Sequence, residues 1–477
     1  MNVTQSNAGW PIRPLEEVVD VLDSKRVPVN ADERKSREGN VPYYGATGQV
    51  GWIDNYLFDE ELVLLGEDGA PFLEPSRPKA YVVSGKSWVN NHAHVLRARP
   101  ERMTTRFLLH QLNSVAYAPY VSGTTRLKLP QGPMKRIPLV APDIGTQVAI
   151  ADEIDKQFSR IEAGVAALER IQANLKRYRA SILKAACEGR LVPTEAELAR
   201  KESRDYEPAT VLLQRILKER RKRWEEAELA KLIAKGKPPK DDRWKSKYEE
   251  PKPPDTTNLP EIPEGWCWAT VEQLLLDRMC NGLSVKGSNS PPGVAALKLS
   301  AMSDDGFDYS EIRYLPVDWA DVEDLSVRAG DFYVSRGNGT LSLVGRGTLA
   351  QPTPQPTIIP DTIIRLRLVP EVTQWTACVW ASRVIRQQIE SRAKTTAGIY
   401  KISQEDLRSV CIPFPSFGEQ HLIIDEVRRC LSLASTTLEA VHRNLQRART
   451  LRSSVLHAAF SGQLCEKGAD DLLSAAE

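Results

Sequence analysis

The sequence predicts an α+β protein in which two mixed α/β domains are joined by two long antiparallel coiled-coil helices in a pseudo-two-fold arrangement. Three observations predict this fold class. Residues 128–191 recur as residues 401–464, 273 positions later and without an insertion. Each copy follows a segment that Gly, Pro and Asn often interrupt, and each carries apolar residues at steps of three and four. A repeat of this length indicates a duplicated domain, because solenoid repeats have periods of roughly 20 to 50 residues.

The first predicted domain covers residues 1–142. Short β-rich runs at 62–65, 80–83 and 94–96 lie between turn signals, and residues 106–112 have a helical pattern. Short strands bounded by turn-forming residues are typical of a domain built around sheets. The sequence therefore predicts a mixed domain with few helices.

The segment 143–192 is predicted to be the first long helix. Pro142 and Asp143 supply start signals, and Gly189 supplies a stop signal. At ~1.5 Å per residue, about 40 residues make a rod roughly 60 Å long. Its apolar residues form one narrow stripe, which is typical of a coiled-coil seam, so we expect the two long helices to pack on each other. The predicted seam consists of Ile161, Val165, Leu168, Leu175 and Ile182 in the first helix and Leu438, Val441, Leu451 and Val455 in the second.

Residues 193–262 are predicted to be a charged helical insert followed by a Pro-rich linker. A helix is expected over 212–235, and 238–263 is expected to be extended. The helix contains the basic run 218–223. Such a run is either a solvated helix face or a surface that contacts DNA or a partner protein, and the sequence leaves both readings open.

The second predicted domain covers residues 263–415. It opens with Gly265-Trp266, as the first opens with Gly9-Trp10. Strands are expected at 295–299, 331–334, 342–344 and 362–368, and a helix at 375–392. Two close glycine pairs, at 337–339 and 345–347, indicate tight turns or a loop that approaches a ligand backbone.

Residues 416–477 are predicted to be the second long helix and a tail. Ser416 and Glu419 have the spacing of a capping box, and Gly462 supplies the stop signal. Asn444 lies in the predicted seam. It either fixes the register of the two helices or is tolerated near a solvated position.

The composition of the 477 residues, with 41% hydrophobic and 26% charged residues, is ordinary for a soluble globular protein. No stretch reaches the 18 apolar residues of a membrane span, and the N-terminus lacks signal-peptide features, so we expect a cytoplasmic protein without a membrane partner. The seven scattered cysteines argue against a disulfide framework and a zinc site. A net charge of +2 does not by itself indicate nucleic-acid binding, and if the protein holds DNA, clustered arginines and lysines or a partner must supply most of the positive charge.

Catalytic motifs are missing from the sequence. There is no phosphate-binding P-loop, no His-Glu-x-x-His, no Gly-x-Ser-x-Gly and no Asp/Asn-Pro-Pro-aromatic tetrapeptide of the kind used by amino-methyltransferases. His92 and His94 lie two positions apart without an evident third ligand, which favours a structural or base-facing role over a metal site. We therefore expect a non-catalytic chain that binds no metal.

Several stretches resemble the specificity subunit of type I restriction–modification systems, and the match covers nearly the whole chain. The order of domain, long helix, domain, long helix carries the resemblance. So do the following stretches: residues 264–266, 42–48, 66–70, 89–94, 395–398 before Lys401-Ile402, and the helix starts at Gln147 and Gln420. The insert at 193–263 departs from the shortest family members.

This resemblance implies two target recognition domains, each reading one half of a split, asymmetric sequence in double-stranded DNA. It also implies that the helices set the gap between the halves and dock two methyltransferase subunits, and that two restriction (motor–nuclease) subunits join for cleavage. No cofactor is then expected on this chain, because S-adenosylmethionine, ATP and Mg²⁺ belong to the partner subunits.

Sequence can be read only by side chains that reach base edges, because phosphate contacts carry no sequence information. Polar residues in predicted loops are the candidates. In the first domain they are Tyr43, Tyr44, Thr47, Asn90, Asn91, His92, Thr124, Thr125 and Arg126. In the second domain they are Arg336, Asn338, Thr340, Lys394, Thr395, Thr396 and Lys401.

Two other function classes remain open from the residues alone. One is a stand-alone sequence-specific DNA-binding protein, and the other is a coiled-coil scaffold whose domains bind proteins. A scaffold predicts no salt-dependent affinity for DNA, whereas a DNA reader loses affinity steeply as salt rises. A stand-alone reader binds tightly without partners, whereas a near-neutral specificity subunit needs them.

Overall fold

The computed structural model describes residues 6, 8–396 and 398–463. The chain divides into two compact units, one formed by residues up to Gln172 together with those from Glu439 onward, the other by Ala173–Leu438. Each unit therefore contains one domain and a part of both long helices. No helix in the described ranges combines the length and the apolar character that crossing a membrane requires.

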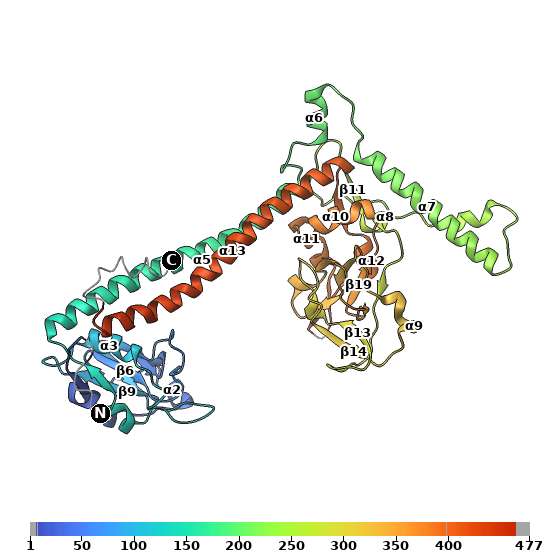
Figure 1. The fold of residues 1–477 in the computed structure, drawn as a ribbon. Coiled ribbons are helices and arrows are strands. Elements are labelled where there is room, and N and C mark those ends of the chain that lie inside the picture. Colours follow the sequence, from blue (N-terminus) through green and yellow to red (C-terminus); the bar gives the residue numbers. More distant parts are fainter. Residues whose placement is uncertain (1–5, 7, 397, 464–477) are drawn as a thin grey trace. The chain divides into compact units, whose positions relative to one another are not determined.

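The first domain is built on a four-stranded antiparallel sheet in the order β2-β9-β6-β7 and a second sheet in the order β4-β3-β8-β5 (Figure 1). The strands predicted at 62–65, 80–83 and 94–96 are present, as is the helix at 106–112. The elements are β1 (Ile12–Pro14), α1 (Leu15–Val18), β2 (Val19–Val21), α2 (Ala31–Ser36), β3 (Val41–Gly45), β4 (Gly48–Ile53), β5 (Phe58–Asp59), β6 (Leu62–Gly66), β7 (Ala80–Val83), β8 (Lys86–Val89), β9 (Ala93–Ala98), α3 (Thr105–Ser114), α4 (Gln131–Lys135) and β10 (Pro138–Val140).

Strand β6 is buried on both faces, which explains its unbroken apolar sequence. Val63 and Leu65 belong to the core that contains Phe107 of α3. Leu62 and Leu64 belong to a separate core with Val89 of β8. Because successive side chains of a strand point to opposite faces, one strand can serve both cores.

The second domain repeats this plan with a four-stranded antiparallel sheet in the order β12-β19-β15-β17 and two three-stranded sheets. Its elements are β11 (Cys267–Thr270), α8 (Val271–Leu274), β12 (Cys280–Asn281), β13 (Val294–Leu297), β14 (Ile312–Leu315), α9 (Trp319–Val322), β15 (Phe332–Ser335), β16 (Gly337–Asn338), β17 (Gly347–Leu349), β18 (Thr357–Ile358), β19 (Ile363–Leu366), α10 (Pro370–Val379), α11 (Arg383–Arg392), β20 (Lys394–Thr396), β21 (Ile399–Lys401), α12 (Gln404–Arg408) and β22 (Cys411–Phe414).

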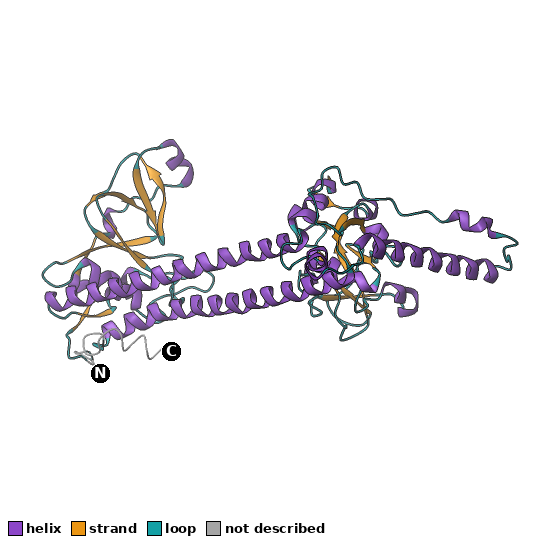
Figure 2. Ribbon diagram, turned by 90° about the horizontal axis from the view of Figure 1, so that it is seen from above, coloured by secondary structure: helices purple, strands orange, loops and turns teal. Residues whose placement is uncertain are grey.

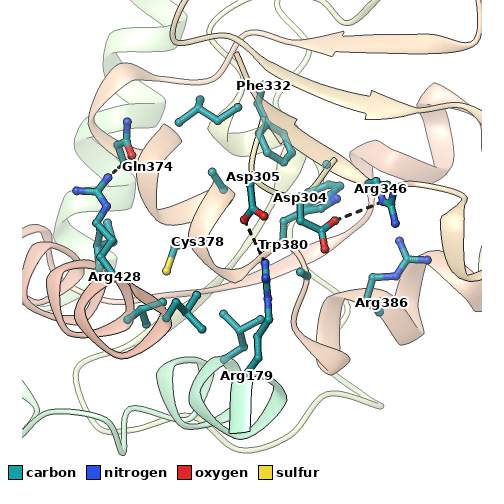
Figure 3. Close-up of a pocket in the computed structure, with 18 of the residues that line it drawn as sticks. Arg179, Asp304, Asp305, Phe332, Arg346, Gln374, Cys378, Trp380, Arg386 and Arg428 are labelled. Atoms are coloured by element: carbon teal, nitrogen blue, oxygen red, sulfur yellow. Dashed lines mark hydrogen bonds and ion pairs between the residues drawn. The ribbon is translucent and has the colours of Figure 1, made fainter. Parts of the chain in front are cut away.

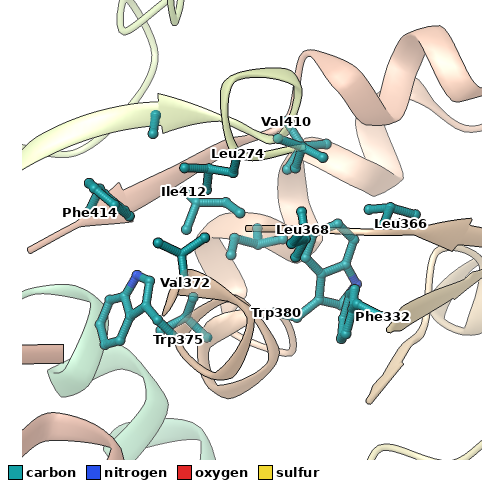
Figure 4. Close-up of a cluster of buried hydrophobic side chains, with 14 of the residues drawn as sticks. Leu274, Phe332, Leu366, Leu368, Val372, Trp375, Trp380, Val410, Ile412 and Phe414 are labelled. Atoms are coloured by element: carbon teal, nitrogen blue, oxygen red, sulfur yellow. The ribbon is translucent and has the colours of Figure 1, made fainter. Parts of the chain in front are cut away.

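Two predictions for this domain were wrong. The strand expected at 342–344 is a 3₁₀ turn at Leu341–Leu343, and the helix expected at 375–392 is interrupted between α10 and α11. The interruption follows Trp380, whose indole nitrogen donates a hydrogen bond to the Gly345 carbonyl at 2.8 Å. Trp380 also packs edge-on against Phe332 in the core shown in Figure 4. A turn at this point lets the chain satisfy both contacts.

Both domains close in the same way, because their first and last strands pair. Strand β1 pairs antiparallel with β10, and β11 pairs antiparallel with β22. Each closing strand leads directly into a long helix. The insert contributes α6 (Glu195–Glu202) and α7 (Ala209–Ala234), and a 3₁₀ turn, Asp242–Lys247, interrupts the segment that was expected to be extended.

The two long helices are α5 (Ile144–Cys187) and α13 (Phe417–Phe460), each of 44 residues, drawn in purple in Figure 2. Within the first unit, Glu162 pairs with Arg452, and Gln172 contacts His442 at 3.0 Å. The residue number rises along α5 as it falls along α13, so the helices are antiparallel. These elements agree with the predicted fold class.

Side-chain burial along the two helices is uneven. Of the nine seam residues named above, Ile182 and Val441 are buried and the others are half-buried. Half-burial is what a helix pair without a further covering layer provides. Asn444 is exposed, which favours the solvated reading over a register-setting role.

Candidate nucleic-acid interface

Five candidate residues of the first domain line one cavity of about 760 Å³. Three different loops supply them: the β3–β4 turn, the β8–β9 loop and the loop that precedes α4. The five residues are Thr47, Asn90, His92, Thr125 and Arg126. Residues up to 79 positions apart in the sequence therefore share one concave surface. Asn91 and Thr124 are exposed beside them.

A carboxylate that the sequence reading did not select organises this cavity. One oxygen of Asp68 forms an ion pair with the Arg126 Nε at 2.7 Å, and the other oxygen lies 3.4 Å from the His92 Nδ1. The Asn90 side-chain oxygen accepts the His92 backbone N–H at 2.8 Å. The Arg126 side chain is still 60% exposed, while that of Asp68 is 24% exposed. Asp68 thus contacts the Nε of Arg126 and the Nδ1 of His92, and the remaining side-chain nitrogens of both candidates stay available to a ligand.

Tyr43 must be removed from the set of candidates. It is 1% exposed, and its hydroxyl donates to the Val29 carbonyl at 3.0 Å. The Arg34 guanidinium covers its ring at 4.8 Å. The side chain is used inside the domain and offers nothing to a ligand. Tyr44, on the other face of β3, is half-buried and packs against Tyr81.

His94 is a structural residue. Its Nδ1 lies 2.7 Å from the Asp23 carboxylate, and its Nε2 lies 2.8 Å from the Leu129 carbonyl. Burial opposes ionisation of Asp23, but the hydrogen bond and charge of His94, together with hydrogen bonds from Val95 and Gln131, lower the pKa of that carboxyl. Asp23, Glu67 and His94 have the spacing of metal ligands, but the Arg26 guanidinium lies 2.6 Å from Glu67 and already supplies a cation there.

In the second domain, a small sheet in the order β16-β21-β20 gathers the candidates. Lys401 lies opposite Gly337 on one side and opposite Lys394 on the other. Thr395 and Asn338 both face Tyr400. Gly337 permits this close approach, because a Cβ there would lie 3.2 Å from the Lys401 side chain. The Thr396 side chain lies outside the described part of the structure.

The charges of this sheet are uncompensated. Among the described residues, no carboxylate lies within 4.0 Å of Arg336, Lys394 or Lys401, and both lysines are exposed. Like charges directly opposite each other in a sheet are destabilising. A surface that keeps two such lysines is suited to a polyanion. Thr340 lies nearby in a turn, where its N–H donates to the Asn338 side-chain oxygen at 3.0 Å.

Equivalent residues make the same hydrogen bond at the start of each long helix. The buried Gln147 donates to the Pro142 carbonyl at 2.8 Å and accepts the Thr104 N–H at 2.9 Å. Its counterpart Gln420, also buried, donates to the Pro415 carbonyl at 3.0 Å. The same hydrogen bond therefore positions the start of α5 in one unit and of α13 in the other.

The helix ends repeat a second contact. Gly189 (φ +60°) follows α5, and a Cβ there would lie 2.4 Å from Pro263 and 3.2 Å from Trp266. Gly462 (φ +86°) follows α13, and a Cβ there would lie 2.4 Å from Ala8, with Trp10 at 3.9 Å. The end of each long helix thus meets the entry to the domain of its own unit.

The capping box expected at Ser416 and Glu419 is replaced by a different contact. The buried Glu419 carboxylate accepts a hydrogen bond from the Trp266 indole at 2.8 Å. Burial raises the pKa of Glu419 above its ordinary value, although the indole hydrogen bond opposes the shift. Glu419 is therefore a docking residue for the second domain.

A cavity of about 1040 Å³ lies beside α10 and α11 in the second unit (Figure 3). Its charged groups satisfy one another: Arg179 pairs with Asp305, Arg346 with Asp304, and Arg428 donates to Gln374. Burial raises the pKa of the Cys378 thiol in its wall to about 12, so the thiol stays protonated and unreactive. We assign no ligand to this cavity.

Comparison with known proteins points to one family. Residues 7–171 match the family model described as the type I restriction modification DNA specificity domain. A protein of Haemophilus influenzae whose name describes a type I restriction enzyme specificity subunit is 35% identical over 150 residues, 31% of this chain and 37% of that protein. The EcoKI specificity subunit of Escherichia coli is 24% identical over 482 residues, which cover 96% of this chain and 89% of that subunit.

The fold has a solved counterpart. A chain from a structure described as the basis of complex assembly and conformational transition of the type I restriction–modification system superposes with a TM-score of 0.55. The alignment covers 95% of this chain and 98% of that chain at 15% identity. At this identity the likeness concerns the fold alone.

Proposed function

This chain belongs to the family of type I restriction–modification specificity subunits, and from that premise we propose that it reads a two-part sequence in double-stranded DNA. In this proposal each domain reads one part, and the chain supplies recognition while its partners supply catalysis. The observation that carries the proposal is the duplicated junction, in which Gln147 and Gln420 make the same hydrogen bond at the start of two long helices that follow domains with different loops. A pair of long helices that carries two domains with different loops suits a target made of two different parts.

The two domains differ in the way they hold their cations, and we infer that they read DNA differently. In the first, Arg126 is oriented by Asp68, which suits a bidentate contact with the O6 and N7 of guanine. In the second, Lys394 and Lys401 are uncompensated point charges on neighbouring strands of a small sheet, with Asn338 and Thr395 beside them. Lysine can donate hydrogen bonds either to a phosphate or to a guanine edge. The two half-sites should therefore differ in sequence.

The helices α5 and α13 are proposed to set the length of the gap that is not read. A 44-residue helix is about 66 Å long at ~1.5 Å per residue. Half-sites read from one side of a duplex lie roughly 34–36 Å apart, one helical turn. A helix pair of this length has room for two docked domains at that separation.

Exposed apolar residues on the long helices support the docking of partner subunits. Leu433 is 57% exposed, Leu422 51% and Val148 43%. A partner that covers these side chains would remove their apolar surface from water. We propose that two methyltransferase subunits cover these helices and that two restriction subunits join through them. S-adenosylmethionine, ATP and Mg²⁺ would bind to those partners, and the complex would work in the cytoplasm, where its DNA lies.

Mapping of modified bases tests the proposal. The chain is co-expressed with its methyltransferase subunit in a host that lacks DNA methylation, and the modified positions are sequenced. We expect one motif made of two defined parts separated by a gap of fixed length. Methylation at a single uninterrupted motif, or methylation that persists without the chain, would contradict it.

A further inference from the structure

The insert forms a basic arm, which we define as residues 215–247. It contains 13 Lys and Arg residues and six Asp and Glu residues, a surplus of seven positive charges. The whole chain carries only +2, so the remaining residues sum to −5. The arm is therefore the place where the positive charge of this protein is concentrated.

Only the beginning of α7 belongs to the core of the second domain. Ala209, Leu212, Leu213 and Ile216 are buried there. Leu217 still packs against that core, and the 18 residues from Leu217 to Ala234 continue the helix from there, a reach of about 27 Å at ~1.5 Å per residue. Figures 1 and 2 show α7 extending away from the strands of this domain.

The arm is braced although it leaves the core. The chain folds back on α7, where Trp224 stacks on Trp244 at 6.2 Å and contacts Tyr248 at 5.3 Å. The Arg221 guanidinium lies over Tyr248 at 5.5 Å and also pairs with Glu250. An unsupported helix of this length is marginal in water. The aromatic cluster therefore keeps the arm ordered without a partner.

The surplus charge is not neutralised within the arm. Seven of its cations have no carboxylate within 4.0 Å among the described residues, and all but Arg220 are exposed: Lys218, Arg220, Lys222, Lys235, Lys237, Lys240 and Lys247. Three of them lie in the turn at the tip, around Gly236. A preformed, projecting and uncompensated group of lysines is suited to phosphates.

We propose that the basic arm is a second DNA contact, which binds phosphates of the duplex flanking the part of the target read by the second domain. This inference rests on the proposed function. A reach of about 27 Å corresponds to roughly 8 base pairs at 3.4 Å each. The contact adds affinity without sequence preference, since lysine ammonium groups on phosphates read no bases.

The test compares two duplexes, one ending at the second half-site and one extended there by ten base pairs. Affinity of the full chain with its methyltransferase subunit is measured at several KCl concentrations. One variant replaces Lys222, Lys235, Lys237 and Lys240 with Gln. Its matched control replaces four arm cations that do have carboxylate partners, namely Arg215, Arg223, Lys231 and Arg243, and so removes the same charge.

For the wild-type complex we expect tighter binding to the extended duplex. The first variant should lose that gain, and its slope of log K against log salt should fall by up to about 3.6, which is ~0.9 for each lost phosphate contact. The control should lose clearly less, and both should keep the preference for target over scrambled DNA. Trp224→Ala, which unbraces the arm without changing its charge, should also reduce the gain.

Equal losses in the variant and its control would overturn the arm contact, and so would an unchanged gain. Loss of the co-purified subunit with unaltered DNA affinity would overturn it in favour of a protein contact. A wild-type complex that does not distinguish target from scrambled DNA would instead overturn the proposed function, so the two failures are distinguishable.

Discussion

Replacement of Asp68 with Asn should weaken sequence discrimination while increasing affinity for non-target DNA. Asp68 holds Arg126 at 2.7 Å and faces His92 at 3.4 Å. The amide keeps the shape of the side chain but removes the charge that orients the guanidinium. It also removes a negative charge from a surface that is proposed to approach phosphates. One substitution therefore moves specific and non-specific binding in opposite directions.

The size of the effect follows from the contact that Arg126 is proposed to make. A bidentate arginine–guanine pair discriminates against the wrong base by about 1–3 kcal/mol. At ~1.4 kcal/mol per factor of ten, this is about 5- to 140-fold. Stability should change little, because the Arg126 side chain is 60% exposed and exposed ion pairs contribute about 0–1 kcal/mol.

Competition binding measures the ratio of affinities for target and scrambled duplexes at fixed salt. Arg126→Gln should lower the same ratio, and the double variant should lose no more than Arg126→Gln alone, because both residues act through one group. Asp59→Asn is the matched control, since Asp59 is an exposed acid on β5 outside the cavity. An Asp68→Asn protein with the wild-type ratio would refute the positioning role.

Three further predictions concern the long helices α5 and α13 and the contacts that hold the domains on them. Charged replacements at both Leu168 and Val441 should separate the long helices and abolish sequence-specific methylation; retained methylation in vivo would contradict the gap-setting role. Gly462→Ala should lower the melting temperature, because φ is +86° and the new Cβ would lie 2.4 Å from Ala8. Its control is Gly164→Ala, which lies in open space inside α5 and should raise the melting temperature by removing a helix-interior glycine. Burial raises the pKa of Glu419 in the folded state, so its contribution to stability should be full below about pH 4.5 and be lost as pH rises through the raised pKa; Glu419→Gln should flatten that decline in pH-dependent thermal unfolding.

The frame could be predicted from sequence because its signals are local or repeated. The apolar periodicity and the terminal glycines located both long helices, whose observed bounds are Ile144–Cys187 and Phe417–Phe460. The break between α10 and α11 was missed because its cause is distant. Trp380 is bound to Gly345, 35 residues away, and no local pattern encodes that contact.

The candidate site was predicted in part, and the failures have physical causes. Tyr43 and Tyr44 are adjacent on β3, whose burial alternates, so only one of them can face outward. The sequence of β3 has apolar character on both faces and gave no means of choosing. Asp68 was missed because acids repel phosphates, and its role is visible only once Arg126 and His92 are seen on either side of its carboxylate.

The two long helices also differ at one position that contacts the neighbouring domain. Asp155 on α5 accepts from Arg106 and from His110 of α3, at 2.8 Å from the latter. The equivalent position on α13 is Arg428, which donates to Gln374 of α10 at 2.7 Å. An arginine in place of Asp155 would face the like charge of Arg106. An aspartate in place of Arg428 would face the Gln374 amide, which has no positive charge to pair with it. The shared residues therefore fix how a domain docks, while this diverged position fits each helix to its own domain. The proposed DNA preference of each domain can then change independently of the other, because the loops lie outside the residues that position the domains.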